Sequence, residues 1–538
     1  MSVIPMIATA SSQQQQELEP FEGIVIDSIE IDNRNIYDVQ NPAYNNIVFR
    51  TANHLHIVTR QAVVRREILL HVGEPFSVDI AEESARNMRA RLALYDAWVE
   101  IEKLAEDKLL VRFVTVDEWS ISGGIRYNRD GNLDKFKFGL TERNLLGQAV
   151  GLGADYYIED GKNDYIAVSF VGRRFQGHKL QIKGTYSGNP EAKRYLLGLS
   201  RPYYDLMQSW KWGISGGGTT DLREIYSDDR LIASNDDDAD RLSIVAGGRT
   251  GRYDKKLEFD VLYDYVCETT RDRRFYSNSP EDSTEALANF PTDSMFHRIG
   301  LVVGVLVHDY VTLRRIDCFG AAEDFRIGPI LQISASYAFS HDSTAFRQMG
   351  VGLGWTGYRG QTLFAADGET SAWHDRSGQL VRRLYALRLW LYNWSLPMTT
   401  MAFNARFMED QPIGGVNRLV MGGTTGLRGY DKYFMTGDRR LIANLEARFL
   451  PGLEILSVQF GATLFVDYGQ TWEYGEELGL DEAYAAIGIG IRVSGEKSSR
   501  SALGRLDLSY SEATGWQISV GSGQYFESFG ASLPLTTY

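Results

Sequence analysis

The residues with the clearest chemistry are one arginine in a glycine-rich segment and two acidic residues that follow it. Arg428 lies in a segment that reads Gly-Gly-Thr-Thr-Gly-Leu-Arg-Gly-Tyr. Glu446 and Asp467 each lie in a later strand-like segment, on the face opposite the apolar residues with which they alternate. A desolvated arginine between two carboxylates forms a strong, directional ion pair. The alternative is an ordinary loop arginine and two solvated acids. The three segments are residues 422–430, 441–449 and 458–469.

In this order and spacing, the motifs resemble the BamA/TamA superfamily of outer-membrane proteins. The loop motif of that superfamily reads roughly Val/Ile/Leu-Arg-Gly-Phe/Tyr, which residues 427–430 match. A strand with an inward Glu follows, here Glu446, and then Phe-x-Asp-x-Gly-x-x-Trp, here residues 465–472. The resemblance implies a sixteen-stranded transmembrane β-barrel with this loop fixed inside the lumen by a structural lock. The expected lock residues are Arg428, Gly429, Tyr430, Glu446 and Asp467.

Composition is compatible with this fold and excludes several others. The chain has 538 residues, enough for more than one domain, and no run of 18 apolar residues that would form a transmembrane helix. Its 29 Tyr, 10 Trp, 25 Phe and 53 Gly suit a barrel with aromatic girdles, although an array of soluble β-sandwiches would also be glycine-rich. The net charge of −14 argues against a nucleic-acid partner, since phosphate contacts need a basic surface.

No set of residues suggests catalysis or a resident cofactor. Asp228, Asp229 and the run 236–238 form an acidic stretch, which we interpret as a solvated loop because it matches no calcium-loop spacing; the alternative is divalent-cation binding. Cys267 and Cys318 are too few for a disulfide framework. No nucleophile elbow or zinc-protease motif occurs. We therefore expect no enzyme activity, no metal ion and no cofactor.

The first 118 residues differ in pattern from the rest. Residues 1–20 look like the remnant of a signal peptide followed by a linker. Residues 21–118 predict the order β-α-α-β-β, which resembles one POTRA domain, the periplasmic module of the same superfamily. The predicted strands are 24–31, 98–101 and 109–114, and the predicted helices are 60–70 and a second one beginning near Asp79, where Asp79 and Glu82 would form a capping box.

Residues 119–526 predict the barrel, and 527–538 a C-terminal extension. Alternating segments number about twenty, against the sixteen that the resemblance implies, and we expect the surplus at 347–373 as loop hairpins or strand extensions. Short turns would lie at one end of the barrel and long loops at the other. The predicted long loops are 221–240, 271–294 and 409–438, the last inserted into the lumen.

The junction between the first and last strands is expected to be a weakly paired lateral seam. The last strand, 516–526, resembles the terminal signal of the superfamily, which ends in an aromatic residue. Glycines in both strands weaken pairing, and an opened seam offers unpaired backbone to an incoming strand. The expected seam residues are Gly123, Gly124, Ile125, Val520, Gly521 and Phe526.

Two functions remain open at this stage. The first is assembly, insertion or translocation of proteins at the bacterial outer membrane, with the POTRA-like domain in the periplasm. Its partners would be outer-membrane lipid, an unfolded or extended polypeptide and periplasmic accessory proteins. The alternative is a passive channel or binding barrel gated by the Arg428 loop. An outer-membrane enzyme is a third and weaker reading.

Overall fold

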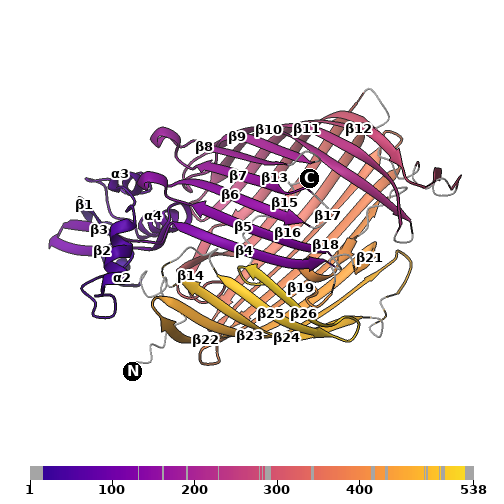
Figure 1. Ribbon diagram of the computed structural model, residues 1–538. Helices are drawn as coiled ribbons and strands as arrows, with labels where there is room; N and C mark the ends of the chain where they lie inside the picture. The colour runs from indigo at the N-terminus through magenta and orange to yellow at the C-terminus, as the bar shows by residue number, and fades with distance from the viewer. Residues whose placement is uncertain are drawn as a thin grey trace.

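The chain forms a small α+β domain at one end of a large β-barrel (Figure 1). We call that end of the barrel proximal and the opposite end distal. None of the described helices is long and apolar enough to span a membrane. The computed structural model describes residues 16–526 except 131–132, 160–162, 189–191, 228–229, 278, 281–282, 285–286, 288–292, 341–344, 413–418, 431–433, 478, 480–482, 496 and 498–502. Most of the predicted leader segment and the extension 527–538 therefore lie outside the described residues.

The α+β domain contains a three-stranded sheet in the order β1-β3-β2, with β1 parallel and β2 antiparallel to β3. Its helices pack on the sheet around a core that includes Ile26, Phe76, Met88 and Phe113. The predicted element order is present, with one additional helix, α2, between the first strand and α3. The elements are η1 (Glu19–Phe21), β1 (Val25–Arg34), α2 (Ile47–Leu55), α3 (Gln61–Arg65), α4 (Val78–Arg91), β2 (Leu94–Ala105) and β3 (Lys108–Asp117).

Helix boundaries in this domain differ from the sequence prediction. The helix expected at 60–70 ends at Arg65, because the chain after it folds back and Pro75 bridges to Val25 at the start of β1. The expected capping box at Asp79 is also wrong. The N-cap of α4 is Ser77, and its side chain makes no capping hydrogen bond.

The barrel is a transmembrane antiparallel β-barrel in which each wall strand pairs with its neighbours in sequence. β13 and β14 both pair with β15 and are two parts of one strand, so the described wall has twenty strands. The strands are β4 (Ile121–Asp130), β5 (Leu133–Glu142), β6 (Val150–Glu159), β7 (Tyr165–Gly172), β8 (Gln181–Gly188), β9 (Lys193–Arg201), β10 (Trp210–Ser227), β11 (Arg230–Gly251), β12 (Lys255–Phe275), β13 (Ser294–Val307), β14 (Asp309–Leu313), β15 (Glu323–Phe339), β16 (Phe346–Arg359), β17 (Thr362–Asp375), β18 (Leu380–Asn393), β19 (Thr399–Pro412), β22 (Arg439–Ile455), β23 (Val458–Trp472), β24 (Tyr484–Gly495), β25 (Gly504–Ser511) and β26 (Gly515–Ser522).

The strand number corrects the expectation of sixteen, which came from the resemblance. Counting alternating segments gave about twenty, and this count is confirmed. β16 and β17 occupy most of the region that we had expected to form loop hairpins, yet both pair along their length as wall strands. Alternation was therefore the better guide here, because every wall strand must present an apolar side to lipid.

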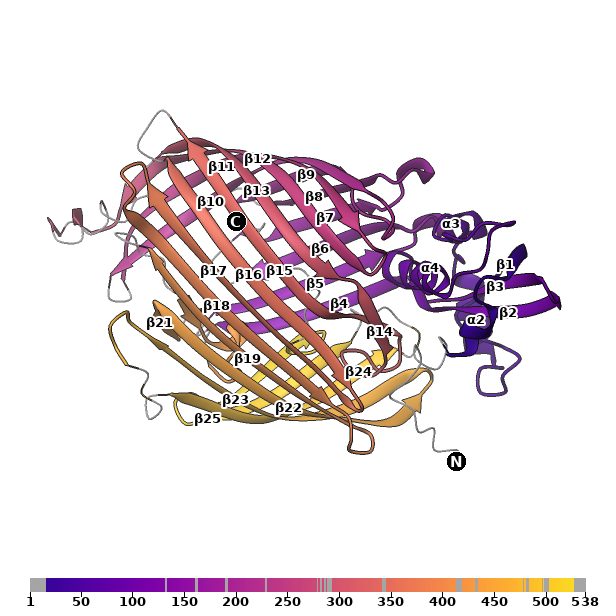
Figure 2. The same ribbon diagram turned by 180° about the vertical axis from the view of Figure 1, so that it is seen from behind.

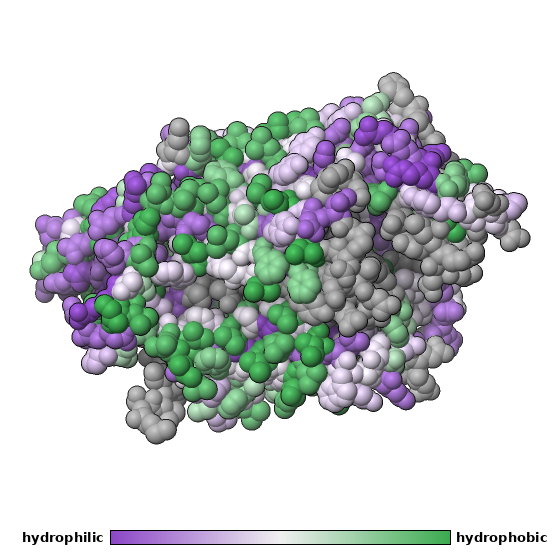
Figure 3. Space-filling model, in the orientation of Figure 1, coloured by the Kyte–Doolittle hydropathy of each residue, from purple (hydrophilic) through white to green (hydrophobic). Residues whose placement is uncertain are grey.

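The apolar face of the wall points outward. On β22, β23 and β24, Leu445, Leu464 and Ile489 are 41%, 63% and 55% exposed. Glu446 and Asp467, on β22 and β23, are buried. Figure 3 shows hydrophobic side chains in a band across the wall, with hydrophilic ones over the α+β domain and towards the distal end. The alternation of polar and apolar residues thus belongs to a membrane barrel with a polar lumen rather than to a soluble sandwich.

The two ends of the barrel differ in their connections. The short turns after β5, β7 and β9 lie at the proximal end, where they contact the α+β domain. The prediction of a long acidic loop at 221–240 is wrong. Most of these residues continue β10 and β11 as a long hairpin. Two of the acidic side chains pair with arginines of β12, Asp236 with Arg274 at 3.5 Å and Asp238 with Arg271.

The α+β domain is docked on the proximal mouth of the barrel (Figure 2). Arg89 on α4 makes a bidentate ion pair with Asp324 on β15, with its Nε and Nη2 at 2.9 and 2.6 Å from the two oxygens. On another side, Arg174 pairs with Glu67 at 2.7 Å, and Tyr253 donates to Glu83 at 2.6 Å. Charged contacts from several barrel turns therefore hold the domain.

We expect this docking to weaken as the pH rises. Burial raises the pKa of Glu82 on α4 to about 7, although Arg86 and Arg89 oppose the shift. A released Glu82 ionises near its ordinary pKa of 4.5. The docked fold therefore binds more protons between these values, so its stabilisation is complete below 4.5 and is lost as the pH rises through 7.

The variant Glu82→Gln tests this pH dependence. The measurement is the temperature at which trypsin first cleaves α4, at pH 5 and at pH 8. In the wild type this temperature should be lower at pH 8 than at pH 5, and in Glu82→Gln the difference should be smaller. Glu100→Gln, at an exposed position of β2, is the matched control. An equal difference in cleavage temperature between pH 5 and pH 8 in the wild type and in Glu82→Gln would contradict the prediction.

Candidate functional site

Arg428 is buried between Glu446 on β22 and Asp467 on β23. Its Nε and Nη2 donate to the two oxygens of Asp467 at 2.7 and 2.8 Å, and Nη1 donates to Glu446 Oε1 at 2.7 Å. The backbone N–H of Arg428 also donates to Asp467 at 3.1 Å. All three side chains are at most 1% exposed. The structure thus brings together the three charged residues that the sequence motifs singled out.

Gly429 and Tyr430 attach the same segment to the next part of the wall. Gly429 has a φ of 84°, a left-handed conformation that favours glycine, and its carbonyl accepts from Ser511 on β25 at 3.3 Å. The Tyr430 hydroxyl donates to the carbonyl of Ala485 on β24 at 2.8 Å. The segment that contains Arg428, including η4 (Gly423–Thr425), is therefore held against four consecutive strands. A short hairpin of β20 (Leu419–Met421) and β21 (Met435–Gly437) forms its base.

Three further charged residues complete the cluster, and the sequence analysis did not include them. Arg448 Nε donates to Glu446 Oε2 at 2.9 Å, so Glu446 joins two arginines. Asp507 on β25 lies 3.6 Å from Arg428 Nη1 and accepts from Arg492 Nη1 at 2.5 Å. Alternation alone could have found Arg448, because it lies two residues after Glu446 on the same face.

After β26 the chain leaves the wall and enters the lumen. Gly523 has a φ of 75° and turns the chain inward. The ring of Tyr525 then stacks on the guanidinium of Arg428, whose carbon lies 4.0 Å from the ring centroid. The carbonyl of Phe526 accepts from Arg448 Nη2 at 2.7 Å. The prediction that Phe526 ends the last strand at the seam is therefore wrong, since the left-handed turn at Gly523 ends the strand first.

The seam between β4 and β26 is the weakest junction of the described wall. One residue pair, Val520 with Tyr127, joins the two strands. Each of the other neighbouring wall strands aligns with its partner over at least seven residue pairs within the described residues. The antiparallel register sets Ile125 opposite Ser522, where β26 ends.

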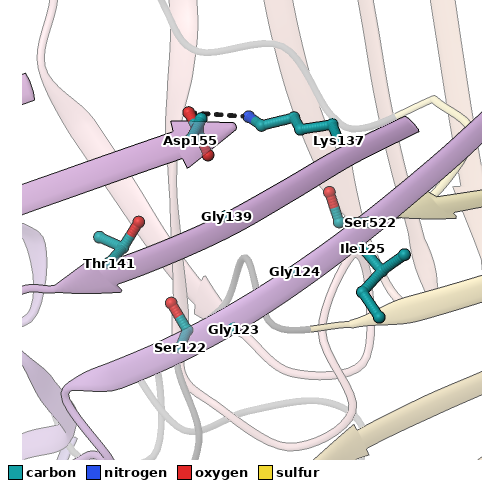
Figure 4. A pocket seen from close by; sticks show the side chains of 9 residues that line it. All are labelled: Ser122, Gly123, Gly124, Ile125, Lys137, Gly139, Thr141, Asp155 and Ser522. Carbon is teal, nitrogen blue, oxygen red and sulfur yellow. Dashed lines mark ion pairs between the residues drawn. The ribbon is translucent and has the colours of Figure 1, made fainter. Parts of the chain in front are cut away.

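Beyond the end of β26, the proximal part of β4 is paired with β5 but has no described strand on its seam side. Gly123 and Gly124 lie in this part, and a Cβ at Gly124 would meet no atom within 4 Å. Gly521, the predicted seam glycine of β26, faces inward against the guanidinium of Arg505. A cavity of about 190 Å³ lies along this part of β4, with an ion pair of Lys137 and Asp155 in its wall (Figure 4). Its lining residues are Ser122, Gly123, Gly124, Ile125, Lys137, Gly139, Thr141, Asp155 and Ser522.

A loop at the proximal end, residues 314–322, links the α+β domain to the buried cluster. We call it the inner loop. Arg314 pairs with Asp96 on β2 of the domain. Ile316 is buried, and its carbonyl accepts from Arg448 Nη1 at 2.8 Å. The inner loop therefore joins the docked domain to the arginine that also holds Phe526.

The described residues contain no group of three or more His, Cys, Asp or Glu side chains arranged to hold a metal ion. Cys267 lies on β12 and Cys318 in the inner loop, and no disulfide joins them. The site that the geometry defines is therefore built from ion pairs, aromatic stacking and an incomplete strand edge. These features suit a structural or conformational role.

No protein-family model and no curated protein sequence matches the chain. Among solved structures, it is similar to BamA from Haemophilus ducreyi lacking POTRA domains 1–3, with 12% identity over 93% of this chain and 84% of that one, and a TM-score of 0.39. It is also similar to CdiB from Escherichia coli, with 11% identity, coverages of 94% and 76%, and a TM-score of 0.48. The alcaligin receptor FauA from Bordetella pertussis matches at 11% identity, with coverages of 78% and 78% and a TM-score of 0.32. At such values these similarities carry no argument about function.

Proposed function

We propose that this protein assembles or translocates polypeptides at the bacterial outer membrane through a laterally opening seam between β4 and β26. The observation that carries the proposal is the single residue pair, Val520 with Tyr127, that joins these two strands. Each backbone pair in a strand ladder contributes to closure, so a junction with one pair opens at a far lower cost than its neighbours.

The proximal part of β4 pairs with β5 on one side, and its other side supplies a template for an incoming strand. On that seam side the backbone around Gly123 and Gly124 has no described partner strand, and glycine leaves room for a second backbone to approach. An extended polypeptide could pair with this edge in line with β26. The outward Ile125, 61% exposed, marks where such a strand would meet lipid.

The α+β domain would receive the polypeptide first. β2 forms one edge of its sheet in the described residues, with β3 as its neighbour on the other side. An exposed sheet edge captures an extended peptide by adding it as a further strand. We therefore assign the POTRA-like role to this domain, with extended polypeptide, periplasmic accessory proteins and outer-membrane lipid as partners.

The lumen supports the seam route over a passive channel. The Arg428 segment fills part of it, and Tyr525 and Phe526 occupy another part. The inner loop enters from the proximal side, where Ile316 packs in one apolar cluster with Phe526. If the Arg428 segment alone moved as a gate, the inner loop and residues 525–526 would still occupy the lumen.

An assembly assay in vesicles tests the proposal. Unfolded outer-membrane barrel protein in urea is diluted into vesicles that contain this protein, and its folding is followed by heat-modifiable gel migration. We expect folding several-fold faster than in empty vesicles. An unchanged rate contradicts assembly, and an unchanged rate together with ion conductance would favour the passive channel.

A further inference from the structure

The α+β domain carries an apolar stripe on α2 that its contacts with the barrel leave uncovered. Ile47, Val48 and Leu55 are 77%, 51% and 68% exposed. At 100° per residue, these three positions and Thr51 fall within an arc of about 100° on the helix. Exposed apolar side chains are common singly, but a continuous stripe on one helix indicates a contact surface.

The opposite face of α2 fixes the helix to its own domain. The ring centroid of Phe49 lies 4.7 Å from that of Tyr37. The side chain of Asn53 donates to the carbonyl of Tyr37 at 2.7 Å and accepts from its N–H at 3.1 Å. Asn46 caps the helix by accepting from two backbone N–H groups. The stripe therefore faces outward because the helix is held, and α2 cannot roll to bury it.

Tyr37 also places α2 next to the rim of the barrel. Its hydroxyl lies 2.9 Å from Ser457 Oγ in the turn between β22 and β23. In this hairpin end Ile455 and Leu456 are 57% and 66% exposed. Figure 1 shows α2 near the proximal end of this hairpin, and Figure 2 agrees. The stripe is thus a neighbour of the apolar outer wall of the barrel.

Exposed apolar side chains occur at several proximal turns, including the turn between β22 and β23. Such side chains occur in turns spread around the rim, and each is at least 41% exposed. An apolar ring at turn level is stabilised by contact with the acyl-chain boundary and would be unfavourable in water. These residues are Leu146, Phe175, Met207, Leu396 and Leu456.

We propose that α2 is an interfacial helix that rests on the proximal surface of the bilayer. Its stripe would insert at the headgroup and acyl-chain boundary, as amphipathic surface helices do. Arg50 and His54 lie beside one border of the stripe, where a basic side chain meets lipid phosphates. Lipid is favoured over a protein occupant because the stripe adjoins a wall that already faces lipid.

The contact would act as a second tether for the domain, additional to its docking contacts. Three apolar side chains bind a membrane weakly by themselves. Attachment to the barrel, however, keeps them at the surface at a high effective concentration. The inference concerns membrane contact and holds or fails independently of the proposed assembly function.

Fluorescence quenching by labelled lipids tests the proposal. Leu55→Cys, in a background with Cys267→Ser and Cys318→Ser, carries the dye NBD, and the barrel is reconstituted in vesicles of phosphatidylethanolamine and phosphatidylglycerol. We expect a blue-shifted emission and quenching by doxyl-labelled phospholipid. Leu104→Cys is the matched control, since Leu104 is 48% exposed in the same domain but lies near the β2–β3 end that points away from the barrel.

A second variant separates the stripe from general proximity to the membrane. With NBD at Val48→Cys, the changes Ile47→Ser and Leu55→Ser should reduce doxyl quenching several-fold while heat-modifiable migration shows that the barrel is folded. Equal quenching at positions 55 and 104 overturns the proposal. A blue shift at position 55 without doxyl quenching also overturns it, because it would show that a second copy or another protein covers the stripe.

Discussion

Arg428→Ala is expected to release the segment 422–430 from the wall and to make it sensitive to protease. The change leaves Asp467 buried without the arginine that meets both of its oxygens. Removing one partner of a buried ion pair costs about 3–5 kcal/mol, because the remaining charge is not compensated. The measurements are the rate of trypsin cleavage within 409–438 and the temperature at which heat-modifiable migration is lost. Both should change strongly.

Three companion variants identify the cause. Arg428→Lys should recover part of the effect, because an ammonium lacks the planar fork that meets both oxygens of Asp467. The double variant Arg428→Ala and Asp467→Asn should keep more protease resistance than Arg428→Ala alone, since position 467 then carries no uncompensated charge. Arg241→Ala removes an exposed pair with Glu268 at 3.3 Å and should have almost no effect. Wild-type protease resistance in Arg428→Ala would refute the lock.

The sequence could predict which face each lock residue occupies, but not the whole cluster. Strand periodicity orients Glu446 and Asp467 inward, and the loop motif supplies Arg428. The hydrogen bond from Arg448 to the carbonyl of Ile316 joins β22 to the inner loop, 132 residues away in the sequence. Periodicity contains no information about such a contact, because it depends on how the inner loop folds back into the lumen.

Residues 516–526 show why an expected strand can extend past the observed one. Apolar residues from Trp516 alternate only as far as Val520, and it is the resemblance to the terminal signal of the superfamily that extends the expected strand to Phe526. The left-handed conformation of Gly523 ends the ladder instead. The aromatic residues that follow pack against buried arginines, Tyr525 on Arg428 and Phe526 on Arg448, and these cation–π contacts favour the inward path.

The stripe on α2 was missed for a different reason. The chain between the first strand and α3 lacks a long periodic pattern, and a nine-residue helix contains only two and a half turns. Its apolar residues could equally have indicated a core-facing helix. The distinction requires the contacts of Phe49 and Asn53, which only the folded domain supplies.

A disulfide across the seam is expected to abolish assembly while leaving the barrel folded. Val520 and Tyr127 are directly opposite each other, so the pair Tyr127→Cys and Val520→Cys should crosslink on oxidation. Opposite residues in antiparallel strands have Cα atoms about 4.5–5.5 Å apart, within the range of a disulfide. Both native cysteines are replaced by serine. Ile125, another of the expected seam residues, lies two residues from Tyr127 on β4.

The decisive comparison uses a second crosslink from the same residue. Leu506 on β25 is the partner of Val520 on its other side, so Leu506→Cys with Val520→Cys ties two strands that are already fully paired. The seam crosslink should reduce vesicle assembly to the rate of empty vesicles, reduction of the disulfide should restore it, and the β25–β26 crosslink should leave it unchanged. If the polypeptide left through the lumen, neither crosslink would change the assembly rate. Full assembly activity in the seam-crosslinked protein would therefore exclude the lateral route and favour passage of the polypeptide through the lumen, because only an opening wall requires β4 and β26 to separate.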